Sequence, residues 1–367
     1  MLPASRPNLV NVQPYKPGKP IEELIRELKI KGEIIKLASN ENPLGTSPKA
    51  LSAMKKYADE SFLYPDDSCY YIRQAIAKKY KLDMDWVMAT AGSVELIYLA
   101  CLAYLRPEDE LMMSEHSFLI AKIGATVMNS KVREIPVKDD YSHDLNRIFS
   151  SITLATKIIY LDNPINPLGT IVKKHELDEF IQKVPENILV VIDEAYNEYI
   201  TTKDYPDSFK YLRQDKNVMV LRTFSKIYGL AGLRLGYGFA KPDIIANLQK
   251  VRYPFNVNRL VQFAGIAALT DIRHVKRSRK INEAGKKYLY EELKNLKLFH
   301  IATYANFVFV SFVEDSQIIF QKLLQQGVIA RPVKEYGFPN ALRITIGTPA
   351  QNKKLINALK IVVQRSA

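Results

Sequence analysis

Short apolar runs that alternate with helix-like segments constrain the fold of this chain more than any other feature of its sequence. The runs have the length of buried strands, and several are rich in β-branched residues. Strands are expected at residues 87–90, 110–113, 131–136, 157–161, 188–193, 218–222 and 235–239, and all of these segments except 131–136 are largely apolar. Helices are expected between them at residues 143–151, 174–183 and 205–214. This alternation predicts an α/β domain whose mostly parallel sheet is covered by helices on both faces.

The character of the sequence changes after Pro254, and this change indicates a second domain. Long, charged helices are expected over residues 257–296, with weak strands after them at 307–312 and 342–346. A length of 367 residues also favours about two domains. The predicted parts are an N-terminal arm with a first helix (1–34), a large domain (35–256) and a smaller α+β domain (257–367).

The predicted arm combines extended chain with one helix. Five prolines interrupt any helical period over the first 20 residues. Apolar residues at positions 21, 24, 25 and 28 then predict an amphipathic helix over residues 21–30. We expect this arm to pack against the smaller domain or against a partner subunit.

A lysine lies in the tight connection between two of the predicted strands. Lys226 follows the run at 218–222, in a segment that is rich in glycine and alanine. Open α/β sheets bind ligands at the carboxyl ends of their strands, and desolvation lowers the pKa of a lysine, which suits it to form a Schiff base. Ser225 and Arg234 offer a hydroxyl and a guanidinium, which together suit a phosphate. A lysine on a surface turn would show the same local pattern.

Two further loops supply the partners that Schiff-base chemistry on a pyridine ring needs. Asp193 ends a predicted buried strand, where a carboxylate could keep a pyridine nitrogen protonated. Tyr196 follows it closely, and Asn166 lies on a loop stiffened by prolines, so both could reach a ring hydroxyl. Each residue alone could equally be a cap or a turn, and only their combination favours a shared site.

The segment Ala91-Gly-Ser-Val-Glu95 adds a predicted anion site. It precedes an apolar helical run at residues 96–105. The free N–H groups at a helix start bind anions readily, which here makes Gly92, Ser93 and Val94 candidates.

In this order, the motifs resemble those of the fold-type I aminotransferases, which use pyridoxal phosphate. Three segments resemble the histidinol-phosphate aminotransferase branch in particular. They are Leu37-Ala-Ser-Asn-Glu-Asn-Pro-Leu-Gly45, Tyr64-Pro-Asp66 and Leu342-Arg-Ile-Thr-Ile-Gly-Thr348. The likeness runs from about residue 15 to residue 348, and it implies a homodimer with shared active sites.

The resemblance implies a role for each candidate residue. Lys226 would hold pyridoxal phosphate and shuttle the proton, with Asp193 and Tyr196 as its catalytic partners. The cofactor-binding residues would be Tyr64 from the partner subunit, Gly92, Ser93, Val94, Phe118, Asn166, Asp193, Tyr196, Ser225, Lys226 and Arg234. The substrate-binding residues would be Tyr15, Asn42, Arg331 and Arg343. No metal site is implied.

Three positions depart from the pattern of the family. His116 stands where a proline is common, Ala121 replaces a usual tyrosine, and Leu168 replaces a usual threonine. Phe118 keeps the aromatic residue that would stack on the cofactor. His116 could be a new substrate contact or a solvated loop residue, and Leu168 is expected to alter packing while leaving the site intact.

The implied reaction is amino transfer between glutamate or 2-oxoglutarate and a small phosphorylated substrate, with histidinol phosphate and imidazole acetol phosphate as the first expectation. Arg331 and Arg343 lie in apolar surroundings, and a buried arginine needs an anionic partner. That partner could be a structural carboxylate or a substrate. A phosphoserine- or phosphothreonine-type decarboxylase and an aromatic aminotransferase remain alternatives. A non-catalytic regulator would need a DNA-binding domain in addition to the predicted parts.

Composition restricts the partners that we expect. The net charge is +13 (52 basic and 39 acidic residues), and the densest basic cluster, at residues 273–280, spreads around more than one helix face. This pattern favours attraction of anionic substrates over nucleic-acid binding. No apolar stretch approaches the roughly 20 residues of a membrane span, and no signal-peptide core is evident. With only Cys69 and Cys101 present, a reducing cytoplasm is expected.

Overall fold

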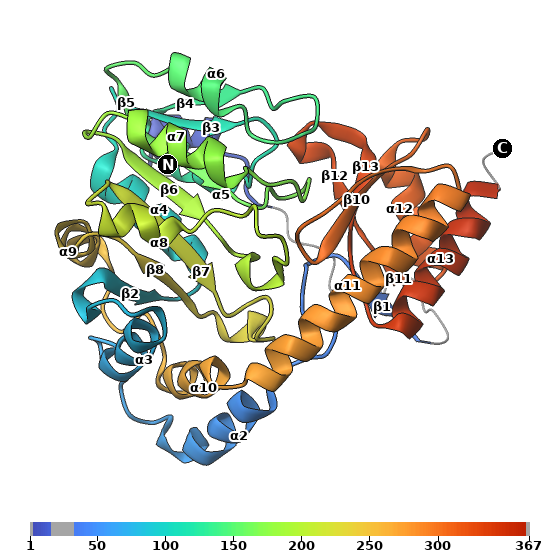
Figure 1. The fold of residues 1–367 in the computed structure, drawn as a ribbon, viewed down its shortest axis with the longest axis horizontal. Helices are drawn as coiled ribbons and strands as arrows, with labels where there is room; N and C mark the ends of the chain where they lie inside the picture. The colour runs from blue at the N-terminus through green and yellow to red at the C-terminus, as the bar shows by residue number, and fades with distance from the viewer. Residues whose placement is uncertain (1–2, 16–32, 365–367) are drawn as a thin grey trace.

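A seven-stranded sheet forms the centre of the larger of two bodies in this computed structural model, which describes residues 3–15 and 33–364 (Figure 1). Its strands, in spatial order, are β2 (Val87–Thr90), β8 (Gly236–Phe239), β7 (Val218–Thr223), β6 (Leu189–Asp193), β5 (Thr156–Asp162), β3 (Glu110–Ser114) and β4 (Lys131–Ile135). β8 runs antiparallel to β2 and β7 on its two sides, and the other neighbouring strands of this sheet pair in parallel. The predicted, mostly parallel sheet is confirmed.

Both faces of the sheet are covered, and side chains alternate between them. In β6, Val190 and Ile192 enter one apolar core, whereas Leu189 and Val191 enter the other. The first core is closed by α3 (Tyr70–Tyr80), α6 (Leu145–Ser150), α7 (Lys174–Lys183), α8 (Ser208–Arg213) and α10 (Arg259–Leu269). The second is closed by α4 (Ser93–Tyr104), α5 (Ile120–Val127) and α9 (Pro242–Val251). Burial on both faces explains why the inner strands, unlike the largely exposed edge strand β4, are continuous apolar runs.

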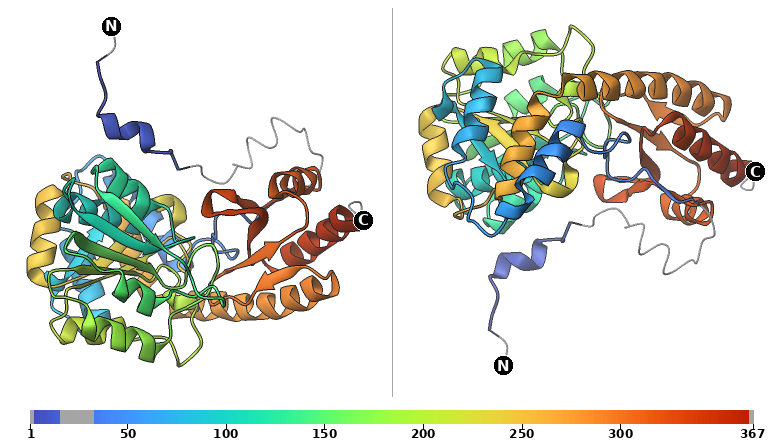
Figure 2. Two further views of the ribbon diagram at one scale, coloured as in Figure 1. Left: turned by 90° about the horizontal axis from the view of Figure 1, so that it is seen from above. Right: turned by 90° about the horizontal axis from the view of Figure 1, so that it is seen from below.

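The smaller body contains a four-stranded antiparallel sheet. Its order is β12 (Arg331–Val333), β13 (Phe338–Thr345), β10 (Phe307–Ser311) and β9 (Phe299–Ile301). It packs with α11 (Ile272–Asn295), α12 (Ser316–Gln325) and α13 (Pro349–Gln364). Figure 2 shows α11 leaving the large body and running along the smaller one.

At both of its ends, the large domain predicted over residues 35–256 differs from the large body of the structure. β1 (Ile35–Lys36) pairs with β11 (Val328–Ile329) and belongs to the core of the smaller body. At the other end, α10 packs against α2 (Pro48–Tyr57) and α3 of the large body. The chain leaves the large body only at Asp271, whose side chain accepts from His274 N and begins α11. We therefore propose a boundary near residue 271, whereas the sequence predicted it at residue 257.

The described part of the arm lies on the large body. Its 3-10 turn η1 (Pro7–Asn11) contacts α5, and Asn8 Nδ2 donates to the carbonyl oxygens of Thr126 and Val127, at 2.7 and 3.0 Å. The helix predicted over residues 21–30 lies outside the described residues. In the part of the chain that the structure describes, no helix combines the length and apolar content needed to cross a membrane.

Candidate active site

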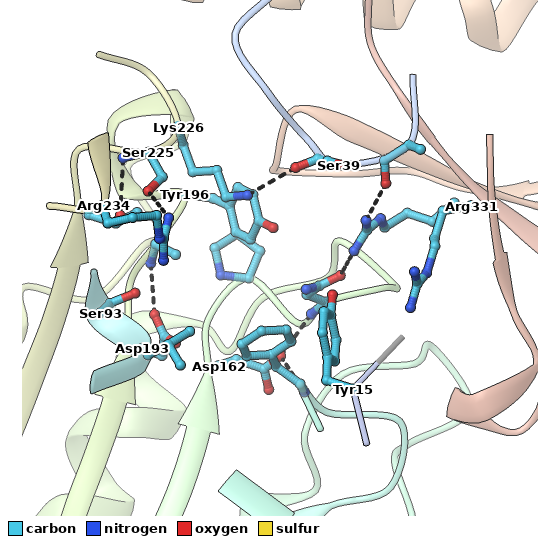
Figure 3. A pocket seen from close by; sticks show the side chains of 18 residues that line it. Tyr15, Ser39, Ser93, Asp162, Asp193, Tyr196, Ser225, Lys226, Arg234 and Arg331 are labelled. Carbon is cyan, nitrogen blue, oxygen red and sulfur yellow. Dashed lines mark hydrogen bonds between the residues drawn. The ribbon is translucent and has the colours of Figure 1, made fainter. Parts of the chain in front are cut away.

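A cavity of about 280 Å³ opens where the carboxyl ends of β5, β6 and β7 face the smaller body. Figure 3 shows Lys226 near its centre, with Ser93, Ser225 and Arg234 toward one end and Tyr15 and Arg331 toward the other. All the predicted site residues line this cavity except Gly92, Tyr64 and Asn42. The structure thus brings together residues that are far apart in sequence.

Lys226 is a buried amine at the carboxyl side of β7. Its Nζ donates to the carbonyl oxygen of Ser39 at 3.2 Å and lies 5.5 Å from the centre of the Tyr196 ring. Burial, together with the positive charges of Arg343 and Arg234, lowers the pKa of Lys226 to about 7. A lysine with this pKa is partly neutral at neutral pH, so it can act as a nucleophile and as a base.

Asp193 places a carboxylate at the end of β6. Its Oδ2 accepts from the Tyr160 hydroxyl at 2.9 Å, and its Oδ1 accepts from the backbone N–H of Ala195 at 3.1 Å. Burial raises the pKa of Asp193 to about 6, although both hydrogen bonds oppose that shift. The group is therefore mostly ionised above neutral pH and suits a cationic ring nitrogen.

A network of hydrogen bonds connects Arg343 of β13 to the large body. Arg343 Nη1 donates to Asn166 Oδ1 at 2.5 Å, and Nη2 donates to the carbonyl oxygen of Ala38 at 2.7 Å. Nearby, Asn40 Nδ2 donates to the Tyr196 hydroxyl at 2.8 Å. Burial raises the pKa of Tyr196 to about 12, so its hydroxyl stays protonated at neutral pH.

The opposite end of the cavity forms a cradle for an anion. Arg234 Nη1 donates to Ser225 Oγ at 3.2 Å, beside Ser93 at the start of α4. A Cβ atom on Gly92 would lie 2.4 Å from Arg234 Nη2, and one on Gly236 would lie 2.2 Å from Ser93 N. The two glycines therefore permit the close approach of a guanidinium, a hydroxyl and a helix N-terminus, which together suit a phosphate group.

The two buried arginines differ in their partners. Arg331 forms an ion pair with Glu335, and its guanidinium lies 5.5 Å from the centre of the Tyr15 ring. In residues 3–15 and 33–364, no carboxylate pairs with Arg343, and its Nε has no hydrogen-bond partner. The structural salt bridge that sequence left open is thus present at Arg331. Arg343 keeps a charge that an anionic ligand can neutralise.

Asp162, at the end of β5, lines the cavity and was not a predicted site residue. Its Oδ2 accepts from the backbone N–H groups of Phe118 and Asn166, at 3.1 and 2.8 Å. Burial raises the pKa of Asp162 to about 7. The sequence carried one signal for it, because Asp162 directly follows the predicted strand at residues 157–161. In the structure it pairs in register with Asp193.

Three predicted residues lie outside the cavity. Asn42, predicted to bind the substrate, lies away from the cavity lining, and its Nδ2 donates to the carbonyl oxygen of Ile227 and to Ser278 Oγ, at 2.7 and 2.8 Å. Gly92 lies behind Arg234. Tyr64 is 80% exposed and packs on Phe255, with ring centres 4.8 Å apart.

Comparison with known proteins places this geometry in a family. The family model for aminotransferase class I and II matches residues 32–359. The chain belongs to this family. The histidinol-phosphate aminotransferase of Moorella thermoacetica is 45% identical, over 99% of this chain and 94% of that protein. Histidinol-phosphate aminotransferase 2 of Pseudomonas fluorescens is 43% identical, over 100% of this chain and 99% of that protein.

One solved structure that matches this chain contains a bound cofactor. Histidinol-phosphate aminotransferase of Sinorhizobium meliloti, in complex with pyridoxal phosphate, matches with a TM-score of 0.91 and 25% identity, over 100% of this chain and 99% of that one. This aminotransferase has the fold-type I architecture and uses pyridoxal phosphate. The cavity fits that group, because the anion cradle, the amine of Lys226 and the carboxylate of Asp193 line one continuous space.

Proposed function

We propose that this aminotransferase moves an amino group between glutamate and imidazole acetol phosphate, giving 2-oxoglutarate and histidinol phosphate in histidine biosynthesis. Full-length relatives that carry the name histidinol-phosphate aminotransferase support this substrate. The observation that carries the proposal is the buried guanidinium of Arg343, which has neutral hydrogen-bond partners and no carboxylate among the described residues. A permanently charged group in that setting requires an anion.

The two substrates would use the same cationic end of the cavity in turn. A glutamate carboxylate and a phosphate both accept hydrogen bonds from a planar guanidinium. Arg343 offers its charge directly, and Arg331 lies next to it in register on β12. Tyr15 closes this end and contacts Phe118 edge to face, with ring centres 6.2 Å apart.

Each residue of the proposed catalytic group has a distinct task. Bound pyridoxal phosphate supplies an electron sink that makes the proton on the amine-bearing carbon removable. Lys226 accepts that proton and returns it, because its lowered pKa lets the neutral amine form near pH 7. Asp193 would hold the ring nitrogen in its cationic form, and Asn166 and Tyr196 would orient the ring oxygen.

We further propose a homodimer that shares its active sites. An exposed apolar patch on the surface of the large body consists of Phe62, Leu63, Tyr64 and Phe255. Tyr64 in this patch would reach the cofactor phosphate of a second copy. The two free, buried cysteines, Cys69 and Cys101, fit a reducing compartment, and we propose the cytoplasm.

Half-reactions with a panel of amino donors test the substrate. Purified protein loaded with pyridoxal phosphate is mixed separately with glutamate, histidinol phosphate, phosphoserine and tyrosine, and the cofactor spectrum is followed. We expect glutamate and histidinol phosphate to convert the cofactor to its amine form fastest. Faster conversion by tyrosine would favour an aromatic aminotransferase. Release of carbon dioxide from phosphoserine, with the cofactor unchanged by glutamate, would favour a decarboxylase.

A further inference from the structure

His116 contacts the smaller body, although it belongs to a loop of the large one. Its Nδ1 donates to the carbonyl oxygen of Tyr336 at 2.5 Å, and its ring lies on Phe338 with ring centres 4.2 Å apart. His116 is half-buried and does not line the cavity. Its sequence position left open a substrate contact or a solvated loop residue, and the structure shows it instead in contact with the smaller body.

The backbone on both sides of this contact is adapted to it. His116 has φ = 64°, which lies in the left-handed region. Proline, with φ fixed near −65°, cannot adopt this conformation. On the facing side, Gly337 has φ = 90°, and a Cβ atom there would lie 3.0 Å from His116 Cε1 and 3.1 Å from Nδ1. The imidazole and the turn thus approach closely because position 337 is a glycine.

A second loop of the large body also contacts the region of this turn. Leu168 is fully buried in one apolar cluster with Tyr336 and Val333 of the smaller body. Two separate loops therefore hold the turn η6 (Lys334–Tyr336), one through a hydrogen bond and one through apolar contact.

The turn that His116 contacts includes a residue that forms an ion pair with an arginine of the proposed substrate site. Glu335 lies in this turn and forms the ion pair with Arg331, while the adjoining strand β13 carries Arg343. On the other side, Phe118 follows His116 by two residues and lines the cavity. The contact between His116 and Tyr336 therefore connects the aromatic wall of the cavity to the turn that fixes Arg331.

We propose that His116 is a positioning residue for anion recognition. It holds the Lys334–Gly337 turn in place, so that Glu335 keeps Arg331 directed toward the anionic group of the substrate. This inference rests on the proposed role of the two arginines. Its effect reaches the substrate through Glu335 and Arg331, so loss of the imidazole weakens anion binding and leaves cofactor binding intact.

The variant His116→Gly tests this inference with little backbone strain, because glycine adopts positive φ freely. Lys81→Gly is the matched control, since Lys81 also has a left-handed backbone (φ = 56°) and is exposed away from the cavity. Both are studied as protein loaded with pyridoxal phosphate. For His116→Gly we expect the KM for glutamate and the dissociation constant for inorganic phosphate to rise about tenfold, the loss typical of one hydrogen bond. Hydrogen exchange at amides 334–337 should accelerate, while kcat and the cofactor spectrum change little.

A second variant separates positioning from general stability. Asparagine tolerates positive φ, and its amide can donate to the Tyr336 carbonyl, so His116→Asn should recover part of the phosphate affinity. A lowered melting temperature in His116→Gly, with unchanged KM, phosphate binding and local exchange, would overturn the proposal. If histidinol phosphate proves not to be a substrate while phosphate binding and exchange respond as expected, the proposed substrate fails and the positioning role stands.

Discussion

Arg343 Nη1 lies 2.5 Å from Asn166 Oδ1, so an arginine of the smaller body is fixed by the loop that follows β5 in the large body. Its second donor, Nη2, reaches the carbonyl oxygen of Ala38 at 2.7 Å. Both acceptors are neutral, which orients the guanidinium without cancelling its charge. After burial, the positive charge of the same arginine is the next cause of the lowered pKa of Lys226. Anion binding and the reactivity of the amine are therefore coupled through one residue.

Replacing the two arginines should have unequal effects. Arg343→Lys loses the planar fork that meets Asn166 and a carboxylate together, so we expect kcat/KM for glutamate to fall about 100-fold. Arg331→Lys should cost about tenfold, because Arg331 already has Glu335 as a partner and acts beside Arg343. Steady-state kinetics measure both, with the cofactor spectrum as the control. Equal losses in the two variants would contradict the assignment of Arg343 as the main anion contact.

The lowered pKa of Lys226 predicts how cofactor binding depends on pH. Only the neutral amine attacks an aldehyde, so the rate at which cofactor-free protein combines with pyridoxal phosphate should rise with pH and level off above about 7. An ordinary lysine would level off only above about pH 10. Stopped-flow absorbance measures this rate. Arg343→Gln removes a positive charge and should move the midpoint to higher pH.

Lys226→Ala supplies the control for that experiment and a test of the proposed base. It should fold as the parent protein does, form no borohydride-reducible chromophore and show no turnover. Near-normal transamination by this variant would mean that another group moves the proton.

The strands and the residues at their ends could be predicted from sequence for a physical reason. Strands buried on both faces are continuous apolar runs, so the first polar residue after each run, such as Asp193, marks the edge where ligands bind. The sequence could not tell in this way which asparagine of the segment 39–42 would contact a residue that lines the cavity. Asn40 has φ = 56°, and this left-handed residue breaks any regular alternation, so Asn40 reaches Tyr196 while Asn42 turns toward α11.

Two other features of the structure, the role of Asp162 and the end of α10, were not predicted from the sequence. The role of Asp162 depends on the backbone N–H of Phe118, 44 residues away, and no local period contains that information. The end of α10 did carry a local signal, because Asp271 is a helix-capping residue type placed before a new apolar period. Continuous helical periodicity over residues 257–296 hid that break.

Asp162 should make the stability of the cofactor-free protein depend on pH. Its pKa is about 7 in the folded protein and 3.8 in its ordinary state, because burial disfavours the carboxylate. The folded state therefore holds this proton more tightly, and its stabilising contribution is full below about pH 4 and is lost as pH rises through 7. Asp193, also raised, adds to the same trend. Asp162→Asn cannot titrate, so its stability relative to the parent should increase between pH 5 and pH 8.

Urea unfolding of the cofactor-free proteins at the two pH values measures this difference. The exposed Asp59→Asn serves as the matched control and should change nothing. A difference between Asp162→Asn and the parent that is the same at pH 5 and pH 8 would show that Asp162 does not titrate in this range.

The glycine behind Arg234 gives a test of the anion cradle in which backbone strain and steric contact can be separated. At Gly92 (φ = 89°), a Cβ atom would lie 2.4 Å from Arg234 Nη2, so Gly92→Ala must displace the guanidinium from Ser225. We expect the dissociation constant for pyridoxal phosphate to rise at least about tenfold, the loss of one charge-assisted hydrogen bond.

Two control variants separate strain from steric contact. Gly45→Ala imposes similar strain (φ = 76°) but has nothing within 4 Å, and Gly232→Ala changes the same loop as Arg234 in open space. Neither control should weaken cofactor binding, because neither moves the guanidinium. If Gly45→Ala weakened binding as much as Gly92→Ala, strain alone would explain the loss, and the close approach of Arg234 to the helix start would not be what holds the phosphate.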